Sequence, residues 1–125
     1  MHLLLDTHVL LWLMNNDPRL SRQAHSLIVN ASEVYVSSAS IWEIAIKSRL
    51  GKIEEDAEVV AEKLEAAGLS ELHVTHRHAV ATGKLPLLHR DPFDRLLVAQ
   101  AICEPMRLLT ADPQLKAYSV LVVAV

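Results

Sequence analysis

Short apolar runs alternate with longer stretches of helical periodicity along this chain. The run HLLL at residues 2–5 has the continuous apolar character of a strand buried on both faces of a parallel sheet. Further strands are predicted at 34–36, 72–74, 107–110 and 120–123. Helical spacing predicts helices at about 8–15, 21–30, 39–50, 56–67, 76–83, 92–104 and 112–117. This alternation predicts an α/β fold, in which a central parallel sheet of about five strands is flanked by helices.

Composition narrows the class of protein. The 125 residues suit one domain, and we expect residues 1–125 to form it. Hydrophobic residues make up 51% of the chain, which argues against disorder, yet no apolar run approaches the roughly 20 residues that a membrane-spanning helix needs. Asp6 interrupts the apolar N-terminus and argues against a signal peptide. The single cysteine, Cys103, excludes an internal disulfide, so we expect a cytoplasmic protein with no membrane partner.

Four acids follow predicted strands or begin predicted helices. Asp6 ends the first strand and Asp112 follows the fourth, so both are expected at the carboxyl edge of the sheet, where open α/β folds place their sites. Glu43 and Asp94 lie near the starts of the helices at 39–50 and 92–104. Because helices that follow parallel strands begin at the edge where those strands end, we expect the four carboxylates to meet there.

Helix capping is the competing explanation for each acid. Asp6 or Thr7, and likewise Thr110 or Asp112, are suited to begin a helix. Other acids fit caps as well: Ser40 with Glu43 has the spacing of a capping box, and Asp91, Pro92 and Asp94 fit the Ncap, N1 and N3 positions. Taken one at a time, capping is the simpler explanation.

Side-chain direction favours a site for two of the acids. Asp94 shares a helix face with the apolar residues Leu97, Val98 and Ala101, so it is expected to point inward. Glu43 lies in an equally apolar stretch. Carboxylates gathered in a partly buried cleft repel one another unless a cation lies among them. Oxygen ligands suit Mg²⁺ or Mn²⁺, whereas the histidines lack the spacing of a zinc site, and His89 only borders the expected cluster.

The segments LLLDT, SSASIWEIAIKSRLGK, LPLLHRDPFDRLLVAQA and LLTADPQL, in this order, resemble the PIN-domain ribonucleases. The similarity is greatest to VapC-type toxins of toxin–antitoxin modules, in the branch that carries HRDPFDR. The resemblance implies that Asp6, Glu43, Asp94 and Asp112 are the catalytic, metal-binding acids, with Thr7 and Asp91 as accessory residues. The sequence departs from the family pattern at His8, where many relatives have Asn, and in TADP, which has no further acid nearby.

What the resemblance implies is a Mg²⁺- or Mn²⁺-dependent endoribonuclease that hydrolyses RNA phosphodiester bonds, the toxin of a type II toxin–antitoxin system. It also implies a homodimer and a cognate antitoxin as partner. Because the net charge is −3, RNA must be held by a local patch. Lys47, Arg90 and Arg95 are candidate phosphate contacts, or else solvated charges that pair with the acids. The alternatives are a receiver-like, Mg²⁺-binding signalling domain and a non-catalytic PIN relative that binds RNA or a protein partner.

Overall fold

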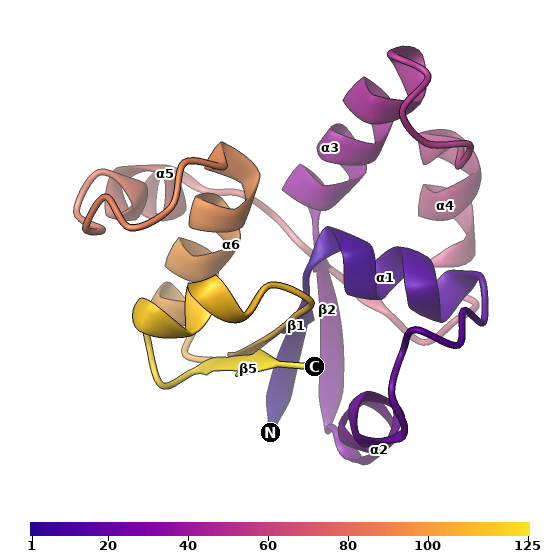
Figure 1. The fold of residues 1–125 in the computed structure, drawn as a ribbon, viewed down its shortest axis with the longest axis horizontal. Helices are drawn as coiled ribbons and strands as arrows, with labels where there is room; N and C mark the ends of the chain where they lie inside the picture. Colours follow the sequence, from indigo (N-terminus) through magenta and orange to yellow (C-terminus); the bar gives the residue numbers. More distant parts are fainter.

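Five parallel strands form the centre of the structure, a computed structural model that describes residues 1–125 (Figure 1). The strands are β1 (His2–Leu5), β2 (Glu33–Ser37), β3 (Ser70–Leu72), β4 (Arg107–Thr110) and β5 (Val122–Ala124), and their spatial order is β3-β2-β1-β4-β5. The helices are α1 (Thr7–Met14), α2 (Arg22–Asn30), α3 (Ser38–Arg49), α4 (Ala57–Lys63), α5 (His76–Thr82), α6 (Pro92–Cys103) and the 3₁₀ helix η1 (Pro113–Ala117). The predicted fold class is confirmed, and none of these helices is long and apolar enough to cross a membrane.

The three leucines of β1 separate two hydrophobic cores. Leu3 and Leu5 face a cluster that α1, α2, α3 and α4 complete, while Leu4 faces a second cluster built on α6, β4 and η1. In Figure 1, α1 and α4 accordingly lie on one side of the sheet, and α5 and α6 lie on the other. All three leucines are fully buried, and burial of each stabilises the fold by about 2 kcal/mol. An uninterrupted apolar run is therefore what this central strand requires.

Two strands differ in position from the sequence prediction. The third strand is Ser70–Leu72 and not 72–74, because Gly68 adopts a positive φ of 77° and turns the chain directly into the sheet. Ser70 then pairs with Tyr35 of β2. The last strand begins at Val122 and not at residue 120, because Ser119 and Val122 close a turn in which Val120 is almost wholly exposed.

The capping box predicted at Ser40 is wrong. Helix α3 begins one turn earlier, at Ser38, and its cap is Ser37, whose hydroxyl accepts a hydrogen bond from the Ala39 N–H. The physical reason is that β2 ends at Ser37 and passes into the helix without a loop. The other predicted caps are confirmed: Asp6, Asp91 and Asp112 begin α1, α6 and η1.

The site lies at the carboxyl ends of β1 and β4. These two strands are neighbours, yet the chain leaves β1 toward β2 on one side and returns to β4 on the other. Helices α1 and η1 start directly beyond them, and the Asp6 N–H donates to the Leu109 carbonyl at 2.9 Å. Such a topological switch point leaves a crevice between two diverging helices, which is where open α/β sheets bind ligands.

Candidate metal centre

Asp6 is the most firmly held of the predicted site residues. Its Oδ1 accepts from the Val9 N–H at 2.8 Å, and its Oδ2 accepts from the Thr110 hydroxyl at 2.5 Å and from the Ala111 N–H at 2.9 Å. Only 3% of the residue is exposed. Burial raises the pKa of Asp6 above its usual value, although these hydrogen bonds act in the opposite direction. The carboxylate is thus fixed in orientation at the junction of β1 and β4.

Thr110 links two of the acids. Its hydroxyl donates to Asp6 and accepts the backbone N–H of Asp112 at 3.0 Å. Because the hydroxyl is fully buried, both bonds replace water that it cannot reach. In the sequence this residue was only a candidate helix cap, and its role as a link depends on β1 and β4 being neighbours.

Glu43 lies beside the edge, in a pair with a lysine. The Thr7 hydroxyl donates to Glu43 Oε1 at 2.6 Å, and Lys47 Nζ donates to Oε2 at 2.6 Å. The hydrogen bond to Glu43 raises the pKa of Lys47, and the charges of Asp91 and Asp94 raise it further. Lys47, predicted as a phosphate contact, is therefore the ammonium that compensates Glu43 in this structure.

Asp94 differs from the other three acids because no group donates a hydrogen bond to its carboxylate. It lies in the first turn of α6, and its side chain is 23% exposed. Burial raises the pKa of Asp94 to about 7, with further contributions from the charges of Asp91, Asp6 and Glu43. The neighbouring Asp91 caps α6 by accepting from the N–H groups of Phe93 and Asp94, at 2.8 and 3.0 Å. Asp94 is thus the one of the four acids whose carboxylate accepts no hydrogen bond, and the charge of His89 only partly offsets the rise in its pKa.

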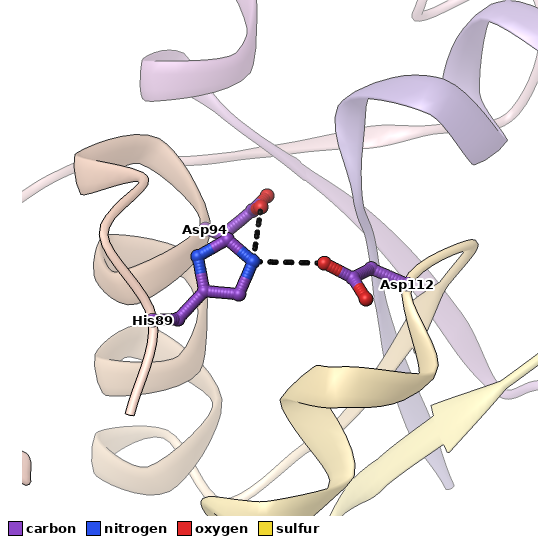
Figure 2. A group of neighbouring side chains, drawn as sticks. All are labelled: His89, Asp94 and Asp112. Carbon is purple, nitrogen blue, oxygen red and sulfur yellow. Dashed lines mark hydrogen bonds and ion pairs between the residues drawn. The ribbon is translucent and has the colours of Figure 1, made fainter. Parts of the chain in front are cut away.

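Asp112 and Asp94 approach the same nitrogen of the His89 ring. Its Oδ1 accepts from the Gln114 N–H at 2.9 Å, and its Oδ2 lies 2.8 Å from His89 Nε2. The same nitrogen lies 3.8 Å from Asp94 Oδ2, and Figure 2 shows this corner of the ring directed at both carboxylates. Partial burial acts to raise the pKa of Asp112, but the bonds from Gln114 and His89 outweigh it and lower the pKa.

One open pocket of about 360 Å³ contains three of the predicted acids. Its lining consists of Asp6, His8, Trp12, Asp94, Ala111, Asp112 and Pro113. Glu43 is connected to this pocket through Thr7, the residue that follows Asp6. The structure therefore brings Asp6, Asp94 and Asp112 together and places Glu43 next to them.

The predicted phosphate contacts Arg95 and Arg90 differ in their surroundings. The Arg95 guanidinium donates to the carbonyls of Thr82 and Pro86, both at 2.9 Å, and to the Tyr118 hydroxyl at 3.0 Å. These bonds hold the loop between α5 and α6, so Arg95 has a structural role. Arg90 is exposed, and its side chain makes no hydrogen bond or ion pair within the chain. It is the better placed of the two to meet an incoming anion.

The donor set fits a hard divalent cation. Carboxylate oxygens of Asp94 and Asp112 lie within 4.8 Å of one another in a group that also includes His89, and Asp6 lines the same pocket. Mg²⁺ and Mn²⁺ prefer such oxygen ligands. The ammonium of Lys47 is bound to Glu43, and Asp94 forms no ion pair with a lysine or arginine, its neighbour being His89 Nε2 at 3.8 Å. A cation bound between Asp94 and Asp112 would supply the missing positive charge.

His89 is the site residue that sequence reasoning placed only at the border. Its ring reaches the centre of the cluster because the His89 N–H donates to the Tyr118 hydroxyl at 2.9 Å, which fixes the loop before α6. The one signal in the sequence was its position two residues before the helix cap Asp91. Nothing local in the sequence showed that the loop folds inward.

Comparison with known proteins gives consistent matches over nearly the whole chain. A family model described as the PIN domain matches residues 3–121. Ribonuclease VapC22 of Mycobacterium tuberculosis is 32% identical over 122 residues, which cover 92% of this chain and 90% of the relative.

Solved structures with the same fold include toxin–antitoxin complexes. VapBC2 from Rickettsia felis, bound to a promoter DNA fragment, matches with a TM-score of 0.74 and 18% identity, covering 100% of this chain and 98% of the other. A toxin–antitoxin complex from Klebsiella pneumoniae matches with a TM-score of 0.66 and 16% identity, covering 97% and 95%. At these identities the structural matches establish the fold.

Proposed function

The chain belongs to the PIN domain family, and from that premise we propose that it is a metal-dependent endoribonuclease, the toxin of a toxin–antitoxin pair. One observation carries the proposal. Asp94 has no hydrogen-bond donor and an elevated pKa, and it shares a pocket with Asp6 and Asp112. An acid that is held partly buried without a partner lowers the stability of a fold, and a catalytic cation gives a reason for it.

The relatives support the choice of RNA as substrate. The curated relative that matches this chain over 90% of its own length is named a ribonuclease. The pocket is open and its lining includes three aspartates, which suits a phosphate bridged by a cation better than an apolar small molecule. Arg90, which is exposed and follows His89 in the sequence, offers a cation to the RNA backbone, and Lys47 becomes a second one if RNA displaces it from Glu43.

Each acid has a distinct task in the proposed mechanism. Asp94 and Asp112 would hold Mg²⁺ or Mn²⁺ together with Asp6, whose three donors keep its carboxylate in one orientation. When bound, the cation would activate water and neutralise negative charge on the phosphate. Glu43, held by Thr7 and Lys47, would orient the attacking water from the neighbouring side. Asp91 would contribute only as the helix cap that fixes the direction of Asp94.

A cognate antitoxin is the proposed protein partner, and a homodimer is the proposed assembly. The support for the antitoxin is that structures with this fold are toxin–antitoxin complexes. An open pocket that exposes uncompensated carboxylates is chemically suited to accept a basic side chain from such a partner. The receiver-like alternative finds no support, because a single acid follows β1 where a receiver domain has a pair.

Sequencing of the RNA ends tests the proposal. Total RNA is incubated with the wild-type protein, Asp6→Asn or Asp94→Asn in the presence of Mg²⁺ or Mn²⁺, or of EDTA. Asp56→Asn is the matched control, because Asp56 caps α4 with the same side chain and lies outside the pocket. We expect discrete new ends with the wild type and the control, and none with the site variants or EDTA. Equal cleavage by all proteins, or cleavage in EDTA, contradicts the mechanism, and no cleavage by the wild type favours a non-catalytic relative.

A further inference from the structure

The ring of His89 lies inside the acid cluster, at the distances that a metal ligand would occupy. Its Nε2 lies 2.8 Å from Asp112 Oδ2 and 3.8 Å from Asp94 Oδ2 (Figure 2). Judged by distance alone, the imidazole is a third ligand beside the two carboxylates. The hydrogen bond at the other ring nitrogen, Nδ1, argues against a metal ligand.

Nδ1 of His89 accepts a hydrogen bond. The backbone N–H of Asp91 donates to it at 3.1 Å, and a backbone N–H can only be a donor. Nδ1 therefore carries the lone pair, and the ring proton is on Nε2. That proton points at Asp112 Oδ2, so the Nε2–H donates to the carboxylate, and both nitrogens of the ring have a partner of the correct kind.

This tautomer is unsuited to bind a cation. A nitrogen that binds a metal must offer its lone pair, and metal-binding histidines as a rule donate through their other nitrogen. In His89 the other nitrogen, Nδ1, faces the Asp91 N–H, which is a donor. If Nε2 bound a metal, the ring proton would have to be on Nδ1, and the Nδ1–H would then point at the Asp91 N–H. The backbone of the α6 cap thus directs His89 away from the metal and toward the carboxylate.

The ring is also held firmly. The His89 side chain is 16% exposed, and its backbone N–H is bound to the Tyr118 hydroxyl, which also accepts from Arg95. Asp112 consequently has one donor on each oxygen, Gln114 on Oδ1 and His89 on Oδ2. Two fixed donors on opposite oxygens set the rotation of the carboxylate plane.

We propose that His89 is a positioning residue, which orients Asp112 for the cation through a fixed Nε2–H and is not itself a ligand. The proposal rests on the proposed function, since the role of Asp112 is part of it. Removal of a group that orients a metal ligand reduces activity or metal affinity by about 10- to 100-fold. We expect His89→Ala to lower kcat by about this factor and to change KM for RNA by less than about threefold, because the substrate is not touched.

Two substitutions distinguish the role of Nε2 from that of Nδ1. The amide nitrogen of Gln reaches the position of Nε2, so His89→Gln restores a donor to Asp112, whereas His89→Asn places its amide at the position of Nδ1. We expect kcat to recover in His89→Gln and to remain low in His89→Asn. His76→Gln is the matched control, since His76 is exposed in α5 and lies far along the chain from the pocket residues. Equal losses in His89→Gln and His89→Asn overturn the positioning role.

Two spectroscopic measurements do not depend on RNA cleavage. In the metal-free protein, a long-range ¹H–¹⁵N correlation spectrum should show His89 with an unprotonated Nδ1 and a protonated Nε2. With Mn²⁺ bound, pulsed electron paramagnetic resonance should show no directly coordinated histidine nitrogen. The opposite tautomer, or a nitrogen coupling that disappears in His89→Ala, overturns the inference.

These readouts also separate the inference from the proposed function. If the wild type cleaves no RNA but the spectra show the expected tautomer and a nitrogen-free Mn²⁺ site, the proposed function fails while the geometry of His89 stands. If RNA is cleaved and Mn²⁺ is bound through nitrogen, only the inference about His89 fails.

Discussion

Replacement of Asp94 by Asn should stabilise the metal-free protein. In the folded state the pKa of Asp94 is about 7, whereas the usual value is 3.8. A raised carboxyl pKa means that the folded state binds a proton more tightly than the unfolded chain does, so stability falls as the pH rises from about 4 to above 7. Asparagine keeps the shape of the side chain and has no charge to bury.

The size of the effect follows from the pKa difference. Between about pH 5 and about pH 8, linkage gives a loss of roughly 2.6 kcal/mol in the wild type, which we halve to about 1.3 kcal/mol because the side chain is partly exposed and solvent screens its charge. At about pH 5 the Asp94 side chain is protonated in the folded protein, so the variant loses no charge there, and any attraction of the ionised form to the N-terminus of α6 at higher pH is already contained in the pKa. The variant should therefore gain stability over the wild type by about 1 to 2 kcal/mol as the pH rises.

Urea denaturation followed by circular dichroism measures this difference. Both proteins are unfolded in EDTA at about pH 5 and about pH 8, with Glu58→Gln as control, because Glu58 is an exposed acid in the first turn of α4. Comparison of variant with wild type removes the contribution of other titrating groups. Addition of Mg²⁺ should then stabilise the wild type and leave Asp94→Asn unchanged, because only a protein that binds the ion gains from it. A stability difference that is the same at both pH values, or a wild type that becomes more stable relative to Asp94→Asn as the pH rises, would contradict a raised pKa of Asp94 in the folded protein.

Three further predictions concern the surroundings of the acids. Thr110→Val should lower the free energy of unfolding by about 1 to 3 kcal/mol in urea denaturation, because it removes the acceptor of the Asp112 N–H and one of the three donors to Asp6; equal stability would contradict the proposed link. Arg95→Gln should speed tryptic cleavage after Lys84 or Arg90, since the guanidinium holds that loop, and an unchanged cleavage rate would show that the loop is held otherwise. In isothermal titration, Mn²⁺ affinity should rise with pH through about 7 as Asp94 loses its proton and level off above, and a pH-independent affinity would exclude Asp94 as a ligand.

The sequence was sufficient to predict where two acids lie. Asp6 and Asp112 follow apolar runs that form parallel strands, and the carboxyl ends of such strands share one edge. The inward direction of Asp94 followed from helical spacing, since Leu97 and Val98 are buried on the same face. These features depend on local patterns and on one topological rule, which is why they could be predicted.

Other features depend on contacts between distant segments. The ring of His89 enters the cluster because Tyr118 and Arg95 hold its loop, and these residues lie 29 and 6 positions further along the chain. The hydroxyl of Thr110 links two acids only because β4 pairs with β1. Ser40 has the spacing of a capping residue, yet the strand before it continues to Ser37 and the helix begins there. Spacing along the chain does not contain this information.

The most direct test of the account is the single-turnover cleavage rate of one RNA, measured against Mn²⁺ concentration for the wild type, Asp94→Asn and the cap control Asp56→Asn. The cleavage rate should saturate with Mn²⁺ in the wild type and the control, and no cleavage should occur in EDTA. In Asp94→Asn the rate should be lower by on the order of 100-fold or more. Cleavage that persists in EDTA, or a wild-type rate in Asp94→Asn, would contradict the claim that these carboxylates hold a catalytic cation.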